Sequence, residues 1–177
     1  PLREVKDPHE VAALHRAGAA VDRIAAELQA GAIPLVGRTE AEVSADLGRR
    51  ILAEGHHRVN FAIVAAGANA ASPHHEPGGT VIEDGQVVLC DFGGTLLDPF
   101  GVGYCSDITR CVWTGEPPAE AAEVYGVLQA AHGAAMAQVT LGASCESVDR
   151  AARDVIGAAG FGDRFIAPGR FERRMDE

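Results

Sequence analysis

Two aspartates, Asp91 and Asp107, are the residues whose type and spacing most clearly indicate chemistry. They are 107 − 91 = 16 positions apart, with apolar or aromatic and β-branched segments around them that read as consecutive strands of one hairpin. The residues between them that favour chain reversal are Gly93, Gly94, Pro99, Gly101 and Gly103. The two carboxylates can therefore lie side by side, and such pairs bind hard divalent metal ions.

A histidine, His74, is the third candidate. It lies 91 − 74 = 17 positions before Asp91, in a loop that follows the apolar run 61–64. Oxygen ligands with a nearby imidazole suit Mn²⁺, Co²⁺, Zn²⁺ or Fe²⁺ and a hydrolytic role. Structural alternatives stay open, because an aspartate that ends a strand is often a turn residue or a helix N-cap. A His-His pair in a loop is usually solvated, and we expect this of His75.

The elements that must position these residues are strands and flanking helices. We predict strands near 59–66, 86–92 and 104–113, and the helices are expected at 8–30, 40–54, 118–140 and 145–159. Asp7 with Glu10, and Thr39 with Glu42, have the spacing of capping boxes for the first two helices. Helices outside an antiparallel sheet make an α+β domain.

The order of these segments resembles the catalytic domain of Xaa-Pro aminopeptidases and prolidases, the pita-bread metallopeptidases, with methionine aminopeptidases as more distant relatives. The matching segments are 61–69, Pro73-His74, 89–93 and the Ser-Asp-Ile-Thr-Arg run at 106–110, and the likeness extends from about residue 3 to about residue 166. The opening at 3–10 looks like the point where that catalytic domain begins, so we expect no N-terminal domain. The Ser-Asp-Ile-Thr-Arg run favours the proline-directed branch.

The resemblance implies a role for each candidate. Asp91 would bind one metal ion, Asp107 would bridge two, and His74 would steady the tetrahedral intermediate. The cofactors implied are two divalent metal ions, Mn²⁺ first, with Co²⁺, Zn²⁺ or Fe²⁺ as alternatives. Thr109 and Arg110 would orient the bridging carboxylate, unless they are a plain cross-strand threonine and a surface arginine.

The chain departs from the family in its second half. There the resemblance implies a histidine in a Gly-His-Gly segment and two glutamates, but no Gly-His-Gly occurs in the sequence. Residues 168–177 resemble the segment that carries the final glutamate, with Asp176 or Glu177 in its place. We therefore expect an incomplete C-terminal half, whether by natural deletion, by truncation or because a stretch is missing from the sequence.

A weak internal repeat supports this interpretation. Residues 37–55 align without gaps on residues 142–160, an offset of 105, and both copies have a Thr or Ser N-cap and a terminal Gly. The first copy precedes the strands with the candidate residues, whereas only 17 residues follow the second. The second copy therefore lacks its sheet.

Composition indicates one domain over residues 1–177, since 47% hydrophobic residues suffice for one core. A net charge of −10 argues against nucleic-acid or anionic-membrane partners. No apolar stretch is long enough to span a bilayer, so we expect a cytoplasmic protein. The four cysteines have no CxxC spacing and are interpreted as reduced, buried residues.

We therefore predict a metal-dependent exopeptidase of the aminopeptidase P or prolidase type. It would hydrolyse peptides with proline at the second position through a metal-bridging hydroxide. The alternative is an inactive pita-bread module that binds peptides or other proteins. A further alternative is a fragment that pairs with a second chain, and we expect a homo-oligomer, such as a dimer, because a missing sheet leaves edges and apolar surface exposed.

Overall fold

The computed structural model of the chain describes residues 5–164. The chain divides into two compact units, residues 1–117 and 118–177. The prediction of one domain over residues 1–177 stays a prediction. The elements of the first unit are α1 (Pro8–Gln29), α2 (Glu40–Ala53), β1 (Arg58–Ala66), the short 3₁₀-helix η1 (Gly67–Ala71), β2 (Val87–Leu97), β3 (Gly103–Cys105) and β4 (Ile108–Trp113).

Local sequence signals determine where α1 and α2 begin. Asp7 accepts a hydrogen bond from the Glu10 amide and its own amide donates to the Glu10 carboxylate, which is the predicted capping box. Thr39 and Glu42 form the same reciprocal pair at the start of α2. Both signals satisfy amides that a helix end leaves unpaired, so both predicted starts are confirmed.

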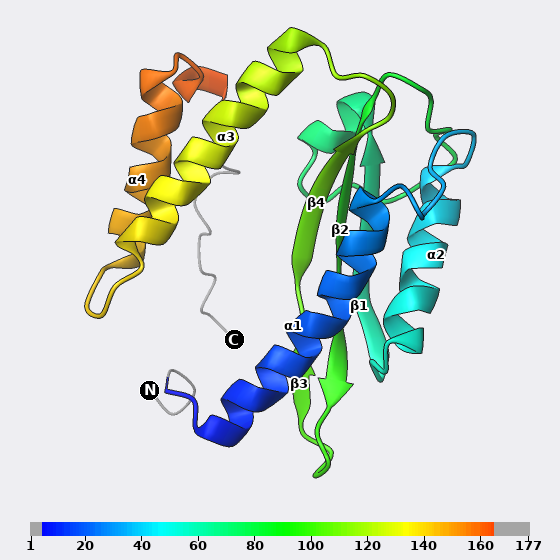
Figure 1. Cartoon of the computed structure of the whole chain (residues 1–177), viewed down its shortest axis with the longest axis vertical. Helices are drawn as coiled ribbons and strands as arrows, with labels where there is room; N and C mark the ends of the chain where they lie inside the picture. The colour runs from blue at the N-terminus through cyan, green and yellow to red at the C-terminus, as the bar shows by residue number, and fades with distance from the viewer. Residues whose placement is uncertain (1–4, 165–177) are drawn as a thin grey trace, which may run out of the picture. The chain divides into compact units, whose positions relative to one another are not determined.

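The sheet of the first unit is antiparallel, with β2 between β1 on one side and β3 and β4 on the other. Helices α1 and α2 cover one of its faces, as Figure 1 shows. Alternate residues of β2 point into that core, so Val88, Cys90 and Phe92 are fully buried. The remaining core residues are Val21, Ile24, Ala25, Leu28, Ile33, Val43, Leu47, Ile51, Val64, Ala66 and Ile82.

Two glycines extend β2 beyond its predicted end. Gly93 and Gly94 are expected to help the chain reverse, but they lie inside the strand, which continues to Leu97. A Cβ on Gly94 would lie 2.6 Å from the Arg58 carbonyl oxygen, so the neighbouring backbone requires a glycine there. The reversal follows at Asp98, whose carboxylate accepts hydrogen bonds from the amides of Phe100 and Val102.

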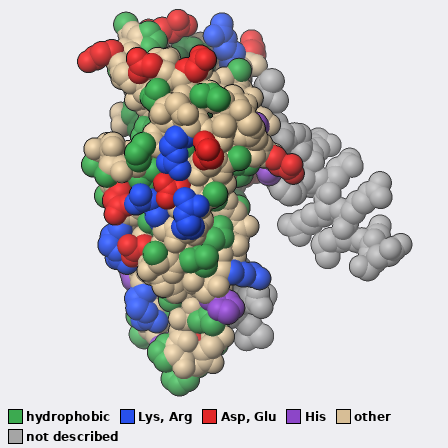
Figure 2. Space-filling model, turned by 90° about the vertical axis from the view of Figure 1, so that its right-hand side faces the viewer, with side chains coloured by type: hydrophobic (Ala, Val, Ile, Leu, Met, Phe, Trp, Pro, Cys, Tyr) green, Lys and Arg blue, Asp and Glu red, His purple; other side chains and the backbone are tan. Residues whose placement is uncertain are grey.

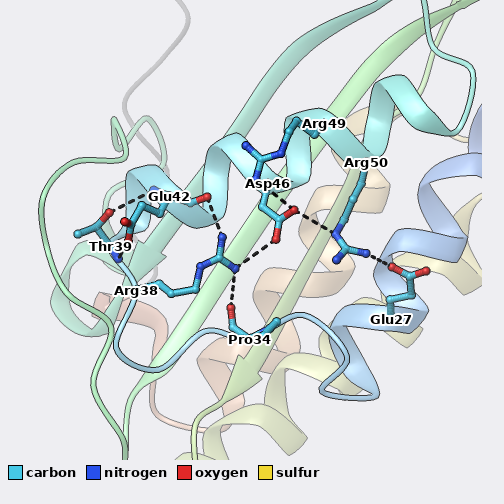
Figure 3. Close-up of polar contacts among 8 residues, drawn as sticks. All are labelled: Glu27, Pro34, Arg38, Thr39, Glu42, Asp46, Arg49 and Arg50. Atoms are coloured by element: carbon cyan, nitrogen blue, oxygen red, sulfur yellow. Dashed lines mark hydrogen bonds and ion pairs between the residues drawn. The ribbon is translucent and has the colours of Figure 1, made fainter.

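A polar network secures the first turns of α2 (Figure 3). The Arg38 guanidinium donates to the carbonyl oxygens of Pro34, at 2.8 Å, and Glu42, at 3.1 Å, and it pairs with Asp46 at 3.2 Å. Asp46 also pairs with Arg50, which reaches Glu27 on α1. Because these contacts join α1, the connecting loop and α2, the start of α2 is held from several sides.

The second unit is a helical hairpin of α3 (Ala119–Gln138) and α4 (Cys145–Ala158), followed by a short 3₁₀-helix, η2 (Gly162–Arg164). Both bounds of α4 are those of α2 shifted by 105 positions. Gly37 and Gly142 have positive φ angles of 81° and 85°, and Gly55 and Gly160 have 96° and 84°. The predicted repeat of this helix is therefore confirmed in structure.

The surface shown in Figure 2 intersperses basic and acidic side chains. None of the helices within residues 5–164 is long and apolar enough to cross a membrane. Cys90 is buried, but Cys105, Cys111 and Cys145 are exposed, so the prediction of four buried cysteines is wrong for three of them. The sequence misleads here because Cys105 and Cys111 lie on strand positions that face away from the helices.

Candidate active site

Asp91 lies near the middle of β2, on the face of the sheet opposite α1 and α2. Its neighbours Cys90 and Phe92 point into the core, so Asp91 points the other way. The strand partner of Asp91 on β4 is Thr109, whose hydroxyl donates a hydrogen bond of 2.7 Å to its carboxylate. This contact favours the interpretation of Thr109 as a residue that orients a carboxylate, although the carboxylate is that of Asp91.

Asp107 lies between β3 and β4, where the predicted strand 104–113 is interrupted. Its preceding residue, Ser106, donates its amide to the Gly94 carbonyl oxygen at 2.9 Å, and its following residue pairs with Phe92. Asp107 therefore lies opposite Gly93, which is two residues after Asp91 on β2. The side chains of Asp91 and Asp107 are thus on the same face of the sheet.

Gly93 makes this close approach possible. A Cβ at residue 93 would lie 2.1 Å from the Ser106 carbonyl oxygen, which is far inside contact distance. The missing side chain lets the peptide that joins Ser106 and Asp107 lie against β2. The glycine thus determines how near the second carboxylate lies to the first.

The two carboxylates influence each other electrostatically. Partial burial raises the pKa of Asp91, the hydrogen bond from Thr109 opposes this, and the negative charge of Asp107 raises the pKa further. Two like charges held on one face of a sheet form a natural site for a cation. The sequence-based prediction that these two side chains converge is therefore consistent with the geometry.

A buried network lies behind Asp107. The His56 ring nitrogen Nε2 is 2.9 Å from the Ser106 hydroxyl, which also accepts a hydrogen bond of 3.2 Å from the Gly94 amide. His56 is only 4% exposed, and this burial is the main reason why its pKa is lowered. A neutral His56 thus buttresses the residue before Asp107.

The third candidate, His74, makes no described hydrogen bond or ion pair with these two aspartates. It is exposed, in the loop that follows η1, and among residues 5–164 no hydrogen bond or ion pair joins it to Asp91 or Asp107. Its neighbour His75 contradicts the expectation of a solvated residue, because its Nε2 lies 2.8 Å from the buried Glu40 carboxylate. The sequence suggests a solvated residue because a loop histidine has no visible partner.

Sequence reasoning missed Glu40, His56 and Ser106. Glu40 has a signal in hindsight, because it shares helical spacing with the buried Val43 and Leu47. Its position in a capping-box segment gives an acidic residue an ordinary explanation and hides that signal. His56 has no signal of this kind, since it lies in a loop after Gly55. Arg110, predicted to help orient a carboxylate, instead donates to the Thr109 carbonyl oxygen.

The donors fit part of a metal site. Two carboxylates on one face are suitable ligands for a hard divalent cation, and the like-charge effect on Asp91 means that a cation would be favoured there. Within residues 5–164, however, no group of three His, Cys, Asp or Glu side chains gathers as a metal site. Asp176 and Glu177 lie outside the described residues.

Residues 11–169 match metallopeptidase family M24. The chain belongs to metallopeptidase family M24. This family uses divalent metal ions, and its peptidase relatives include dipeptidases, prolidases and aminopeptidases.

Three M24 relatives illustrate the likeness. A probable dipeptidase PepE of Mycobacterium tuberculosis is 44% identical over 165 residues, which cover 93% of this chain and 42% of the relative. A putative Xaa-Pro aminopeptidase of Mycoplasma genitalium is 33% identical over 168 residues, covering 93% of this chain and 46% of the relative. The crystal structure of a prolidase from Thermococcus sibiricus superimposes with a TM-score of 0.85 at 38% identity, covering 94% and 44% of the two chains.

These M24 relatives confirm the predicted family and fold class. The chain has the α+β architecture of the pita-bread metallopeptidases, with an antiparallel sheet and outer helices. It spans less than half the length of the curated relatives that it matches. The predicted likeness to only part of a catalytic domain therefore agrees with the comparisons.

Proposed function

We propose that this chain carries part of the active site of a metal-dependent exopeptidase that hydrolyses N-terminal Xaa-Pro bonds, of the aminopeptidase P or prolidase type. The observation that carries the proposal is the placement of Asp91 and Asp107 on one face of the sheet, close enough for Asp107 to raise the pKa of Asp91. Relatives with the words Xaa-Pro aminopeptidase and prolidase in their names support the substrate class.

Each candidate residue has a role in this proposal. Asp91 and Asp107 would hold the divalent ions, with Asp107 shared between them, and Thr109 fixes the rotamer of Asp91 through its hydrogen bond. When bound, the ions supply Lewis-acid activation of water and of the scissile carbonyl group. His74, on its exposed loop, donates a hydrogen bond to the tetrahedral intermediate. Mn²⁺ is our first choice of ion, and two ions is our proposed number.

Metal binding is tested first, because it needs no substrate. We expect Mn²⁺ to bind in calorimetric titration, and Asp91→Asn and Asp107→Asn each to weaken binding by about tenfold or more. Asp98→Asn is the matched control, since Asp98 is a buried aspartate just after β2 whose carboxylate pairs with His9 on α1. Equal Mn²⁺ affinity in all four proteins would rule out the assignment of Asp91 and Asp107.

Hydrolysis of an Xaa-Pro dipeptide with added Mn²⁺ tests the reaction itself. We expect His74→Ala to keep Mn²⁺ affinity and to lose about 10²- to 10³-fold in kcat, as the removal of an oxyanion donor does elsewhere. His57→Ala, at another exposed histidine, is the control. A His74→Ala variant with unchanged kcat would remove His74 from the proposed mechanism.

A second candidate function is a catalytically inactive module that binds peptides. The observation in its favour is that residues 5–164 gather no set of three metal-binding side chains. Binding of an Xaa-Pro peptide without any response to Mn²⁺ would support it. A cytoplasmic location and assembly into a homo-oligomer remain our proposals, and the measured mass in solution tests the latter.

A further inference from the structure

Glu40 is a buried charge that the proposed reaction does not use. It lies at the first position of α2 and is 0% exposed, unlike the other acidic residues of that helix. A carboxylate removed from water is unstable unless donors surround it. The partners of Glu40 therefore indicate what it does.

All four donors to Glu40 come from one segment, residues 66–78. Oε1 accepts from the Ala66 amide at 2.8 Å and from the Asn69 side-chain amide at 2.9 Å. Oε2 accepts from the His75 ring nitrogen Nε2 at 2.8 Å and, at 3.5 Å, from the Gly78 amide. Both oxygens are thus engaged, and His74 lies between the donors.

The Glu40 carboxylate accepts these hydrogen bonds strongly because it stays ionised. Burial by itself would raise the pKa of Glu40, but the hydrogen bonds from Asn69, Ala66, His75 and Gly78 together lower it below the usual range. An ionised acceptor makes stronger hydrogen bonds than a neutral one. Its place in the first turn of a helix adds a favourable interaction with the helix dipole.

The backbone at Glu40 is also held in place by hydrogen bonds. The Glu40 amide donates to the Thr80 carbonyl oxygen at 3.0 Å, and the Ala41 amide donates to that of Gly78 at 3.0 Å. The Arg38 contacts with Asp46 and Glu42, drawn in Figure 3, hold the same end of α2. The segment 66–78 is therefore fastened to the helix by backbone and side chain together.

We propose that Glu40 is a positioning residue that holds the segment 66–78, and with it His74, in one arrangement. This inference rests on the proposed function only for what His74 does. The anchoring itself is a property of the metal-free chain. Experiments without metal or substrate can therefore test it separately.

The variant that tests the anchoring is Glu40→Gln. It keeps the size of the side chain, but it replaces one acceptor oxygen by an amide that faces donors. Asp98→Asn is the matched control, because Asp98 is also buried and accepts from two backbone amides and a histidine, His9. Asp98 contacts no residue of the segment 66–78 in the described hydrogen bonds.

Two measurements on the metal-free chain report on the segment. We expect Glu40→Gln to speed amide hydrogen exchange within residues 66–78 by at least about tenfold, while exchange in α1 stays unchanged. The ring NMR signals of His74 should split into several sets, or shift and broaden if the arrangements exchange quickly. Asp98→Asn should affect exchange only near Phe100 and Val102.

The outcomes separate positioning from general stability. Unchanged exchange in residues 66–78 together with unchanged His74 signals would overturn the proposal. So would equal acceleration throughout the first unit, because Glu40 would then act only on global stability. Should Glu40→Gln not fold, His75→Phe removes one donor from the loop side, and the same local loss of protection is expected at smaller size.

Kinetics provide a readout that a purely structural role would not move. In dipeptide hydrolysis, we expect Glu40→Gln to lower kcat by about tenfold with KM changed less than about twofold, because a misplaced His74 affects the intermediate more than the substrate. A loss only in KM would overturn the link to His74. A wild-type chain without activity would contradict the proposed function, whereas the exchange and NMR results would still decide the role of Glu40.

Discussion

Asp91 and Asp107 show how a sheet can hold two like charges together. Strand register places both on the face that α1 and α2 leave free, and Gly93 lets the second approach the first. Neither side chain is placed by its own preference, because the backbone of three strand segments determines both positions. The proposed metal ligands are therefore only as rigid as the sheet.

The charge of Asp107 should be measurable at Asp91. We predict that Asp107→Asn lowers the pKa of Asp91, since the neighbouring negative charge raises it in the wild-type chain. Carbon-13 NMR titration of the Asp91 carboxyl group checks this directly. Asp22→Asn, on α1 and so on the other side of the sheet, is the control and should leave the Asp91 titration unchanged. An identical titration after Asp107→Asn would mean that the carboxylates do not interact.

His56 should make the fold sensitive to mild acid. Burial lowers its pKa below the ordinary 6.5 of imidazole, so the unfolded chain takes up the proton first as the pH falls. Stability should therefore be lost as the pH falls from about 6.5 to the lower folded pKa. We expect His56→Phe to remove this part of the pH dependence of the unfolding midpoint, at a cost of about 1 kcal/mol for the hydrogen bond to Ser106.

A matched variant isolates this effect. His57 is the exposed neighbour, so His57→Gln should keep the wild-type dependence on pH. If His56→Phe and the wild-type chain lost stability in parallel between pH 7 and pH 5, the acid sensitivity would come from another group.

At the scale of elements, sequence signals predict most helices and fewer strand details. Capping residues and apolar periodicity place α1 and α2 within one residue of their observed ends. The strands are harder, because Gly93 and Gly94 have turn chemistry but serve as close-approach positions inside β2. The break at Asp107 has no local signal, since it depends on what Ser106 contacts across the sheet.

In the candidate site, too, some residues have a local sequence signal and others do not. Asp91 and Asp107 can be chosen as candidates from the sequence because aspartates flanked by apolar strands stand out, and their role as ligands stays a prediction. Glu40, His56 and His75 are not, because the partners of their side chains lie between 26 and 50 positions away in sequence. Only the folded chain shows that these residues are buried and paired.

The close packing of β2 at Gly93 can be tested directly by substitution. We predict that Gly93→Ala costs about 3 kcal/mol or more in free energy of unfolding, because its Cβ would lie 2.1 Å from the Ser106 carbonyl oxygen. Urea denaturation measures the loss. Gly18→Ala in α1 meets no atom within 4 Å and should be neutral or slightly stabilising. Equal stability of Gly93→Ala and the wild-type chain would contradict the packing described here.

For the whole molecule, the division into two units has an energetic meaning. Almost all of the buried apolar side chains belong to residues 1–117, and the second unit contributes only Ala131 and Ile156 among the described residues. A unit that buries so little of its own surface has little to stabilise it. The first unit should therefore fold without the second.

We predict that a chain of residues 1–117 unfolds cooperatively in urea. Its single tryptophan, Trp113, lies on β4 and provides the fluorescence signal. Residues 118–164 alone should show weak helicity and no cooperative transition. A 1–117 chain without a cooperative transition would show that the second unit is needed for the core.

The rate at which the Cys90 thiol is alkylated can report how often the sheet opens. This thiol is buried on the central strand, and burial raises its pKa to about 12, so an alkylating reagent meets neither an accessible nor an ionised sulfur. Cys105, Cys111 and Cys145 are exposed and should be consumed earlier, with Cys111 the slowest of the three because burial raises the pKa of its thiol. The slow alkylation of Cys90, which is adjacent to Asp91, then measures the rate at which β2 opens. A ligand that bridges the strands should lower this rate.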